Sequence, residues 1–215
     1  MPVDPKACVR ISAFNWVPPF AQGYVRDLRV RWALEEAGIP YAVRKLNAAA
    51  DRPADYFEEQ PFGQVPSYRD GNISLFESGA IVLHIGRDCE ALLPPDGAAR
   101  TRATAWLIAA LNSVEPFVMQ LTTIDIFCAG ESWAKERRPA VVEMIGKRLS
   151  RLADALGDKS YLDGDTFTAG DLMMTSVLRS LDGPDRAASQ PRRLQGTLPG
   201  AAGLQGSPRR PACRF

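Results

Sequence analysis

Hydrophobic and polar positions divide the chain into a mixed first half and a helical second half. Residues 8–15 are rich in β-branched and aromatic side chains, and residues 41–46 alternate, which is typical of strands. Between them, residues 27–38 place apolar side chains at helical spacing, and Gly38 with Pro40 ends that helix. Because a helix joins the two strands, we expect the strands to be parallel.

A second set of elements lies at residues 61–86, with the sequence PFGQVPSYRDGNISLFESGAIVLHIG. Residues 67–69 and 73–76 read as two short strands, joined by an Asp-Gly-Asn turn in which Gly and Asn tolerate positive φ. Ser78 then stands at the position of a helix N-cap and is followed by an apolar helix. The stretch therefore predicts a hairpin and a helix.

Pro66 fits poorly at the start of a strand, because proline cannot donate a hydrogen bond to a neighbouring strand. A cis peptide bond between Val65 and Pro66 would turn the chain there. It would also leave the N–H and C=O groups of Val65 pointing outward, where they can bind an extended peptide through its backbone.

From residue 98 onward the pattern is helical only. We expect a long helix that bends at Pro116, then a second helix with Pro139 near its start. In a third helix, Thr168 is the predicted N-cap, and Asp171 can reach back to it in a capping box. The apolar faces of the first two helices are formed by Leu107, Leu111, Val114, Val118 and Leu121, and by Val141, Ile145, Leu149, Leu152 and Leu156.

These elements predict an α/β domain followed by an all-α domain. Residues 1–88 form a βαβ-ββα layout of the thioredoxin-like type, with one short helix expected within residues 48–60. Residues 89–97 (CEALLPPDG) are the linker, because Pro-Pro-Asp-Gly stops any helix. Residues 98–181 are the helical domain, and residues 182–215 form an irregular tail.

Composition narrows the class of protein without identifying it. The chain has 215 residues, 46% of them hydrophobic, and a net charge of +1, so bulk charge implies neither nucleic acid nor an anionic membrane as a partner. The first residues lack the apolar core of a signal peptide, and no run approaches the roughly 18 apolar residues of a spanning helix. We therefore expect a soluble, cytoplasmic protein.

The cysteines and the one histidine give little sign of a metal site. Cys8, Cys89, Cys128 and Cys213 form no CxxC pair and lack metal spacing, which predicts free thiols in a reducing compartment. His84 lies on a mostly apolar helix, where a packed or partly exposed side chain is the simpler interpretation than a catalytic one. We expect no metal.

Two motifs in residues 61–86 carry a resemblance to a known family. QVPSY and FESGAIVLHI resemble the Val–cis-Pro and Glu/Gln-Ser signatures of the cytosolic glutathione transferases, bacterial type, in the same order and at the same separation. The resemblance extends from about residue 7 to residue 179. It implies a detoxifying enzyme, a homodimer in the cytoplasm, which uses glutathione as cosubstrate and joins its thiolate to a small electrophilic substrate.

The resemblance also implies a set of glutathione ligands. Val65, held by Pro66, would pair with the cysteinyl backbone, and Gln64 with the same backbone or the glycyl end. Glu77 would pair with the γ-glutamyl ammonium. Ser78 and the helix N–H groups behind it would suit the γ-glutamyl carboxylate. Arg44 and Lys45 are both candidates for the glycyl carboxylate, and the sequence does not select between them.

The family also needs a donor that stabilises the glutathione thiolate, because a free thiol has a pKa of about 8.5 and is mostly protonated at neutral pH. The expected Ser or Cys is missing. Aligning RVRWALEE with the first helix of the family puts Tyr24 at the usual hydroxyl position. The alternatives are Asn15, Trp16 and Arg26, and Tyr24 can equally be an aromatic cover over a loop.

Several alternatives stay open at this point. The second-substrate candidates Trp106, Asn112, Phe117 and Met119 are also plausible core residues. The chain could instead be a non-catalytic glutathione-binding or interaction module of this fold, or a glutathione-dependent isomerase or peroxidase.

The tail from residue 182 is dense in Pro, Gly, Arg, Ala and Ser and lacks the final helices that the resemblance implies. A permitted choice of codons for residues 193–215, read one nucleotide later, gives AYRARCLGRPAYKAHRADQLAAF, which resembles such a helical tail. Our hypothesis is a frameshift, and the alternative is a disordered extension. The coding DNA distinguishes them.

Overall fold

The computed structural model describes residues 3–71 and 73–181. Within that part the chain forms two compact units, one up to Gly97 and one from Ala98. The predicted tail, with its frameshift hypothesis, lies outside the described residues, as does Cys213. Each unit is described by itself.

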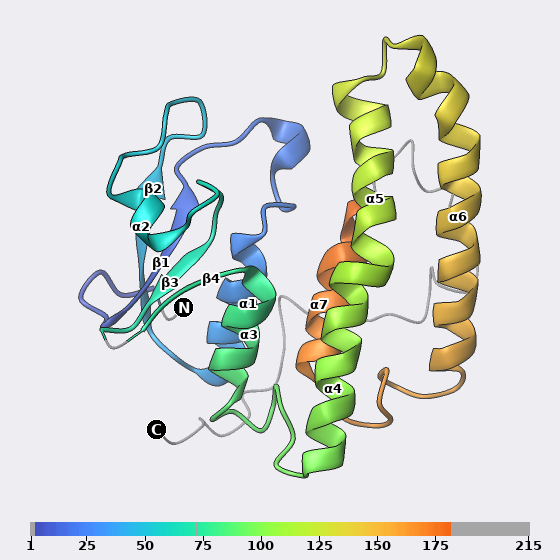
Figure 1. Cartoon of the computed structure of the whole chain (residues 1–215). Helices are drawn as coiled ribbons and strands as arrows, with labels where there is room; N and C mark the ends of the chain where they lie inside the picture. Colours follow the sequence, from blue (N-terminus) through green and yellow to red (C-terminus); the bar gives the residue numbers. More distant parts are fainter. Residues whose placement is uncertain (1–2, 72, 182–215) are drawn as a thin grey trace. The chain divides into compact units, whose positions relative to one another are not determined.

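The first unit is built on a four-stranded sheet in the order β2-β1-β3-β4 (Figure 1). The strands are β1 (Val9–Phe14), β2 (Tyr41–Leu46), β3 (Ser67–Arg69) and β4 (Ser74–Phe76). β1 is parallel to β2, and β3 is antiparallel to both β1 and β4. The predicted strands and the parallel crossover are confirmed, with small shifts at the strand ends, and the fold is thioredoxin-like.

Helices cover both faces of this sheet. α1 (Asp27–Ala37) and α3 (Ser78–Gly86) lie together on one face, and the short α2 (Tyr56–Glu59) lies on the other (Figure 1). A 3-10 turn at Pro19–Ala21 precedes α1. Gly38 ends α1 at a φ of 68°, a left-handed conformation that glycine adopts without steric cost. The core between the sheet and the two long helices contains Ile11, Val30, Leu34, Ile81 and Val82.

The start of α3 differs from the sequence prediction. Glu77, not Ser78, is the N-cap residue, and Ser78 is the first helical residue with no capping hydrogen bond. The Ser78 hydroxyl instead accepts a hydrogen bond from Arg29 of α1, with 3.3 Å between Nη1 and Oγ. The prediction of a Ser78 cap was wrong because a local pattern does not reveal a partner on a neighbouring helix.

The second unit begins with one continuous helical rod that contains two π-helical turns. It consists of α4 (Gly97–Ala109), η2 (Ala110–Val114), α5 (Glu115–Thr122) and η3 (Thr123–Phe127). Where the sequence predicts a bend at Pro116, the structure has a π turn just before this residue. Proline lacks an N–H and its ring crowds the carbonyl four residues earlier, so a wider turn accommodates it.

α6 (Ser132–Leu156) begins earlier than the sequence predicts. Pro139 lies inside this helix, seven residues after Ser132, so the prediction that Pro139 stands near the start was wrong. Pro139 is exposed, and the carbonyl that its missing N–H would have paired with can be hydrated. The predicted apolar face of α6 is buried throughout: Val141, Ile145, Leu149, Leu152 and Leu156.

α7 (Ala169–Leu178) starts with the predicted capping box, and a 3-10 turn at Arg179–Leu181 follows it. The Thr168 side chain accepts a hydrogen bond from Gly170 N–H, and the Asp171 carboxylate accepts one from Thr168 N–H at 2.9 Å. Asp171 also accepts from Leu162 N–H at 2.8 Å, which ties the preceding loop to the helix. α7 is buried along most of its length.

In the described part of the chain, one helix is long and apolar enough to span a membrane by length and composition, namely Gly97–Phe127. The sequence predicted no such segment. Leu107, Val114, Val118 and Leu121 of this rod are buried, whereas Ile108, Met119 and Phe127 are exposed.

Candidate functional site

The segment before β3 presents a free stretch of backbone. The Val65–Pro66 peptide bond is cis. Among residues 3–71 and 73–181, the N–H and C=O groups of Val65 have no hydrogen-bond partner. The Val65 side chain is buried with Leu46 and Tyr56, and Phe14 and Val25 pack against them. The side chain is therefore anchored while the backbone stays available.

Two buried hydroxyl groups hold the chain on both sides of Val65 and Pro66. Tyr56 Oη donates to the carbonyl oxygen of Gln64 at 2.5 Å, and Ser67 N–H donates to Ser12 Oγ at 2.6 Å. Ser12 Oγ and Tyr56 Oη lie 2.7 Å apart. Burial raises the pKa of Tyr56, although the hydrogen bond with Ser12 opposes this, so the phenol stays protonated at neutral pH.

The start of α3 places an exposed carboxylate beside buried donors. Glu77 has a φ of 68° and a ψ of 113°, a conformation that L side chains rarely adopt. Its carboxylate has no ion-pair or hydrogen-bond partner in the described residues. Ser78 is buried behind it, at the end of the helix where free N–H groups attract an anion. Glu77 and Ser78 together therefore suit a group with both an ammonium and a carboxylate.

Arg29 is a residue of this region that sequence reasoning missed. Its side chain is buried, and it donates to Ser78 Oγ. The only signal in the sequence was an arginine in the first turn of an otherwise ordinary helix. Nearby, the carboxyl group of Asp27 is also buried, and burial raises its pKa although the hydrogen bond from Arg31 opposes the shift. The Arg31 Nε and Asp27 Oδ2 atoms lie 2.7 Å apart.

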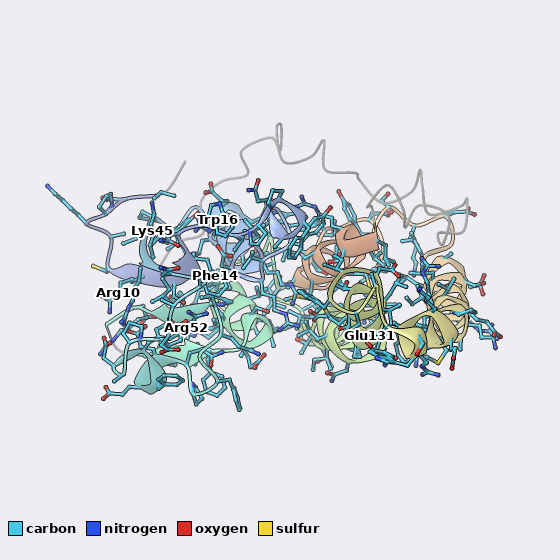
Figure 2. The ribbon with its side chains drawn as sticks, turned by 90° about the horizontal axis from the view of Figure 1, so that it is seen from above. Arg10, Phe14, Trp16, Lys45, Arg52 and Glu131 are labelled. Carbon is cyan, nitrogen blue, oxygen red and sulfur yellow. The ribbon has the colours of Figure 1, made fainter. Side chains whose placement is uncertain are left out.

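The candidates for the thiolate donor all lie in the region between β1 and α1. Asn15 and Trp16 follow the end of β1, where Figure 2 shows Trp16 and Phe14 at the opposite end of the strand from Arg10. Tyr24 lies in a turn and is 42% exposed. Arg26 is the half-buried N-cap residue of α1.

The positions of these four candidates do not select one of them as the thiolate donor. Asn15 has its N–H engaged with the carbonyl oxygen of Leu46 at 2.8 Å. Trp16 is exposed, and Tyr24 presents a hydroxyl that has no partner in the described parts of the chain.

The two cations proposed for the glycyl carboxylate differ in availability. Arg44 is engaged, since its guanidinium donates to Glu59 at 2.9 Å and to Asp55 at 2.8 Å. Burial lowers the pKa of Arg44, but these two carboxylates outweigh it and the net shift is upward. Lys45 is exposed on the edge strand β2.

Arg52 is a third cation, which no motif in the sequence singles out. Its Nε donates to the carbonyl oxygen of Gly63 at 2.9 Å, and its Nη1 donates to the carbonyl oxygens of Asn47 and Ala50. The guanidinium also lies over the ring of Phe14, 4.9 Å from its centroid (Figure 2). Its charge thus has no carboxylate partner among the described residues, and it is fixed beside the Val65 segment.

The candidates for a second substrate lie in the helical unit and are partly engaged there. The guanidinium of Arg148 stacks over the ring of Phe117 at 4.0 Å. Trp106 is half-buried and packs closely against Gly170, while Asn112 is exposed on the π turn and Met119 is 37% exposed. The structure therefore leaves Asn112 and Met119 more accessible than the other two.

His84 takes the structural position that the sequence predicts. Its Nε2 lies 3.2 Å from Asp70 Oδ2, and its ring packs edge-on against Tyr68. The residues that the structure describes contain no group of three or more His, Cys, Asp or Glu side chains that could hold a metal ion.

Comparison with known proteins shows a similarity to glutathione S-transferases. Residues 21–87 match the family model of the glutathione S-transferase N-terminal domain. Glutathione S-transferase 4 of Zea mays is 28% identical over 189 residues, which cover 83% of this chain and 80% of that protein. A theta class glutathione S-transferase from Xanthomonas axonopodis pv. citri, solved with glutathione bound, superposes with a TM-score of 0.74 at 25% identity, covering 94% and 95% of the two chains.

Residues 21–87 thus match the glutathione S-transferase N-terminal domain, and most of the chain is similar to glutathione S-transferases. Glutathione S-transferase 1 of Zea mays is 29% identical over 164 residues, covering 69% of this chain and 72% of that protein. A glutathione transferase from Burkholderia graminis, solved with two glutathione molecules per subunit, has the same fold, with a TM-score of 0.74 at 22% identity. Val65, Glu77 and Ser78 all lie within the residues that match the N-terminal domain model.

Proposed function

We propose that this chain is a glutathione transferase, which binds glutathione in its first unit and conjugates the thiolate to a small electrophile. The observation that carries the proposal is the Val65 backbone, which has no partner among the described residues while its side chain is anchored in the core. An extended peptide can pair its own N–H and C=O with such an edge. The cysteinyl residue of glutathione is the segment that would bind there.

The charged groups at the two ends of glutathione are complementary to side chains on either side of Val65. Glu77, whose carboxylate is exposed and unpaired among the described residues, would bind the γ-glutamyl ammonium, and Ser78 with the first N–H groups of α3 would bind the carboxylate. For the glycyl carboxylate we now propose Arg52, because Arg44 is neutralised by Asp55 and Glu59.

Tyr24 is our proposed donor to the thiolate, with Asn15, Trp16 and Arg26 as alternatives. Its exposed hydroxyl lacks a partner in residues 3–71 and 73–181, so it is available to a ligand. A hydroxyl that donates to sulfur favours the thiolate and lowers the thiol pKa. The thiolate then attacks the electrophilic carbon, a C–S bond forms, and a leaving group such as chloride departs with the bonding electrons.

The proposal is tested in two stages. Calorimetry measures whether the protein binds glutathione, and a conjugation assay with an activated chloronitroarene measures whether it is an enzyme. Binding and turnover together support the transferase. Binding without turnover on any electrophile would favour the alternative, a glutathione-binding module, which the missing Ser or Cys in the loop after β1 supports. No binding would refute both.

We also propose a homodimer that uses an aromatic surface on the first unit. Phe62 is 68% exposed and packs edge-on against the exposed Phe76, with 6.1 Å between the ring centroids. Phe57, also exposed, lies beside Gly63, next to Phe62 in the chain. Three exposed phenylalanines in one area favour a protein partner, and a second copy is the partner that the family implies.

A further inference from the structure

The hydrogen bonds around Val65 and Pro66 form a connected series, in which each donor and each acceptor can be assigned in only one way. Tyr56 has a single hydroxyl proton, and it donates this proton to the carbonyl oxygen of Gln64. The contact between Ser12 and Tyr56 must therefore use the Ser12 proton, which leaves Ser12 Oγ to accept from Ser67 N–H. The bonds run from Ser67 N–H through Ser12 and Tyr56 to Gln64 C=O.

This series of hydrogen bonds begins and ends on either side of Val65 and Pro66. Gln64 C=O and Ser67 N–H are the backbone groups immediately before and after Val65 and Pro66, and both are fixed by buried side chains. Ser67 is held a second time, because its hydroxyl donates to Glu59 at 2.9 Å. The Arg44 guanidinium, which also binds Glu59, lies over the ring of Tyr56 at 5.3 Å. The Tyr56 ring therefore has little freedom to move.

From this geometry we infer that Ser12 and Tyr56 are positioning residues for glutathione. They touch no ligand themselves, but they set the orientation of the Val65 backbone to which the cysteinyl residue of glutathione would bind. This inference rests on the proposed function. It adds two residues, one from β1 and one from α2, that no pattern in the sequence assigns to binding.

The test is to remove one hydroxyl and measure affinity for two ligands. Tyr56→Phe leaves Gln64 C=O and the Ser12 hydroxyl without their partner in a buried site, so the segment should shift to satisfy them. We expect the dissociation constant for glutathione, measured by calorimetry, to rise about tenfold, which corresponds to about 1.4 kcal/mol. Tyr41→Phe is the matched control, because Tyr41 is equally buried and its hydroxyl contacts Glu35 on the opposite face of the sheet.

The second ligand separates a positioning role from a general structural one. Glutathione methylated on its cysteinyl nitrogen cannot donate to Val65, so it should bind the wild type weakly. If Tyr56 acts through Val65, Tyr56→Phe should change the affinity for this analogue by less than twofold. A general structural defect would weaken both ligands by the same factor, and that result would overturn the inference.

Ser12→Ala provides a second variant in case Tyr56→Phe does not fold, and it should show the same split between the two ligands. In the wild type, hydrogen exchange gives a further check: Ser67 N–H should already be protected without ligand, while Val65 N–H should become protected only when glutathione binds. If the wild type does not bind glutathione, the proposed function fails and this inference fails with it. If the wild type binds and both variants bind within twofold of it, this inference alone is overturned.

Discussion

At the scale of single residues, Glu77 combines a strained backbone with a proposed binding role. A side chain with a φ of 68° costs roughly 1–3 kcal/mol in such a region, and it persists only where the surroundings fix it. β4 ends directly before Glu77 and α3 begins directly after it, so both neighbours fix the conformation. This strained backbone conformation places the Glu77 carboxylate at the start of α3.

Two substitutions separate the backbone strain at Glu77 from the proposed role of its carboxylate in binding glutathione. Glu77→Ala and Glu77→Gly both remove the carboxylate, so we expect each to weaken glutathione binding by about 10- to 100-fold, the range for a hydrogen bond to a charged group. Only glycine relieves the positive φ, so Glu77→Gly should be more stable to urea than Glu77→Ala by about 1 kcal/mol. Equal stability of the two variants would contradict the strain, and unchanged affinity would contradict the binding role.

Tyr24 is the residue on which the proposed chemistry depends. If its hydroxyl donates to the thiolate, Tyr24→Phe removes the interaction that lowers the thiol pKa. The rate of conjugation rises with pH as the thiol loses its proton. In the variant this rise should therefore move upward, toward about 8.5 for the free thiol.

The pH dependence of kcat in the wild type and in Tyr24→Phe measures this shift, with the KM for glutathione as the control for binding. Superimposable pH profiles would show that Tyr24 is an aromatic cover, and Asn15, Trp16 and Arg26 would then be tested in turn.

At the scale of elements, the second unit depends on close packing between α4 and α7. A Cβ atom added at Gly170 would lie 2.6 Å from Trp106 Cβ and 3.1 Å from the carbonyl oxygen of Ala103. One of these atoms belongs to the backbone of α4 and the other is bonded directly to it. Neither can therefore move away as the end of a flexible side chain could. The two helices can approach closely because residue 170 has no side chain.

We therefore expect Gly170→Ala to lower the free energy of unfolding by about 1–3 kcal/mol, the range for overpacking a core. Gly146→Ala in α6 is the matched control, because a Cβ there meets no atom within 4 Å. That control should raise helix stability by about 0.5–1 kcal/mol, because alanine has the higher helix propensity. Urea denaturation of both variants measures the difference, and a Gly170→Ala variant as stable as the wild type would refute the close approach.

At the scale of the whole molecule, the proposed dimer predicts a mass of twice 23.5 kDa in solution. Phe62→Ser removes the most exposed ring of the aromatic surface on the first unit, so it should shift the protein toward monomer at micromolar concentration. Phe127→Ser is the control, because Phe127 is similarly exposed, at 65%, but belongs to the helical unit. Light scattering coupled to gel filtration measures the mass, and a dimer that is unaffected by Phe62→Ser would place the interface elsewhere.

The sequence by itself determined the order and type of the elements in the first unit. Local rules sufficed there: alternation for β2, the turn residues at Asp70 and Gly71 for the hairpin, and Gly38 for the end of α1. The capping box of Thr168 and Asp171 was also correct, because both partners lie within one turn of the same helix. These features depend on neighbours in the chain, and a sequence shows neighbours directly.

The tertiary structure alone decided which distant residues meet. The hydrogen bond between Arg29 and Ser78 joins two helices, and the one between Ser12 and Tyr56 joins a strand to a helix on the other face of the sheet. The structure also showed that Arg44 is already neutralised while Arg52 lies beside the Val65 segment. Such pairs arise because folding brings together residues that are not neighbours in the chain, from 11 to 49 positions apart here, and their side chains carry no local signal of the partner they will meet.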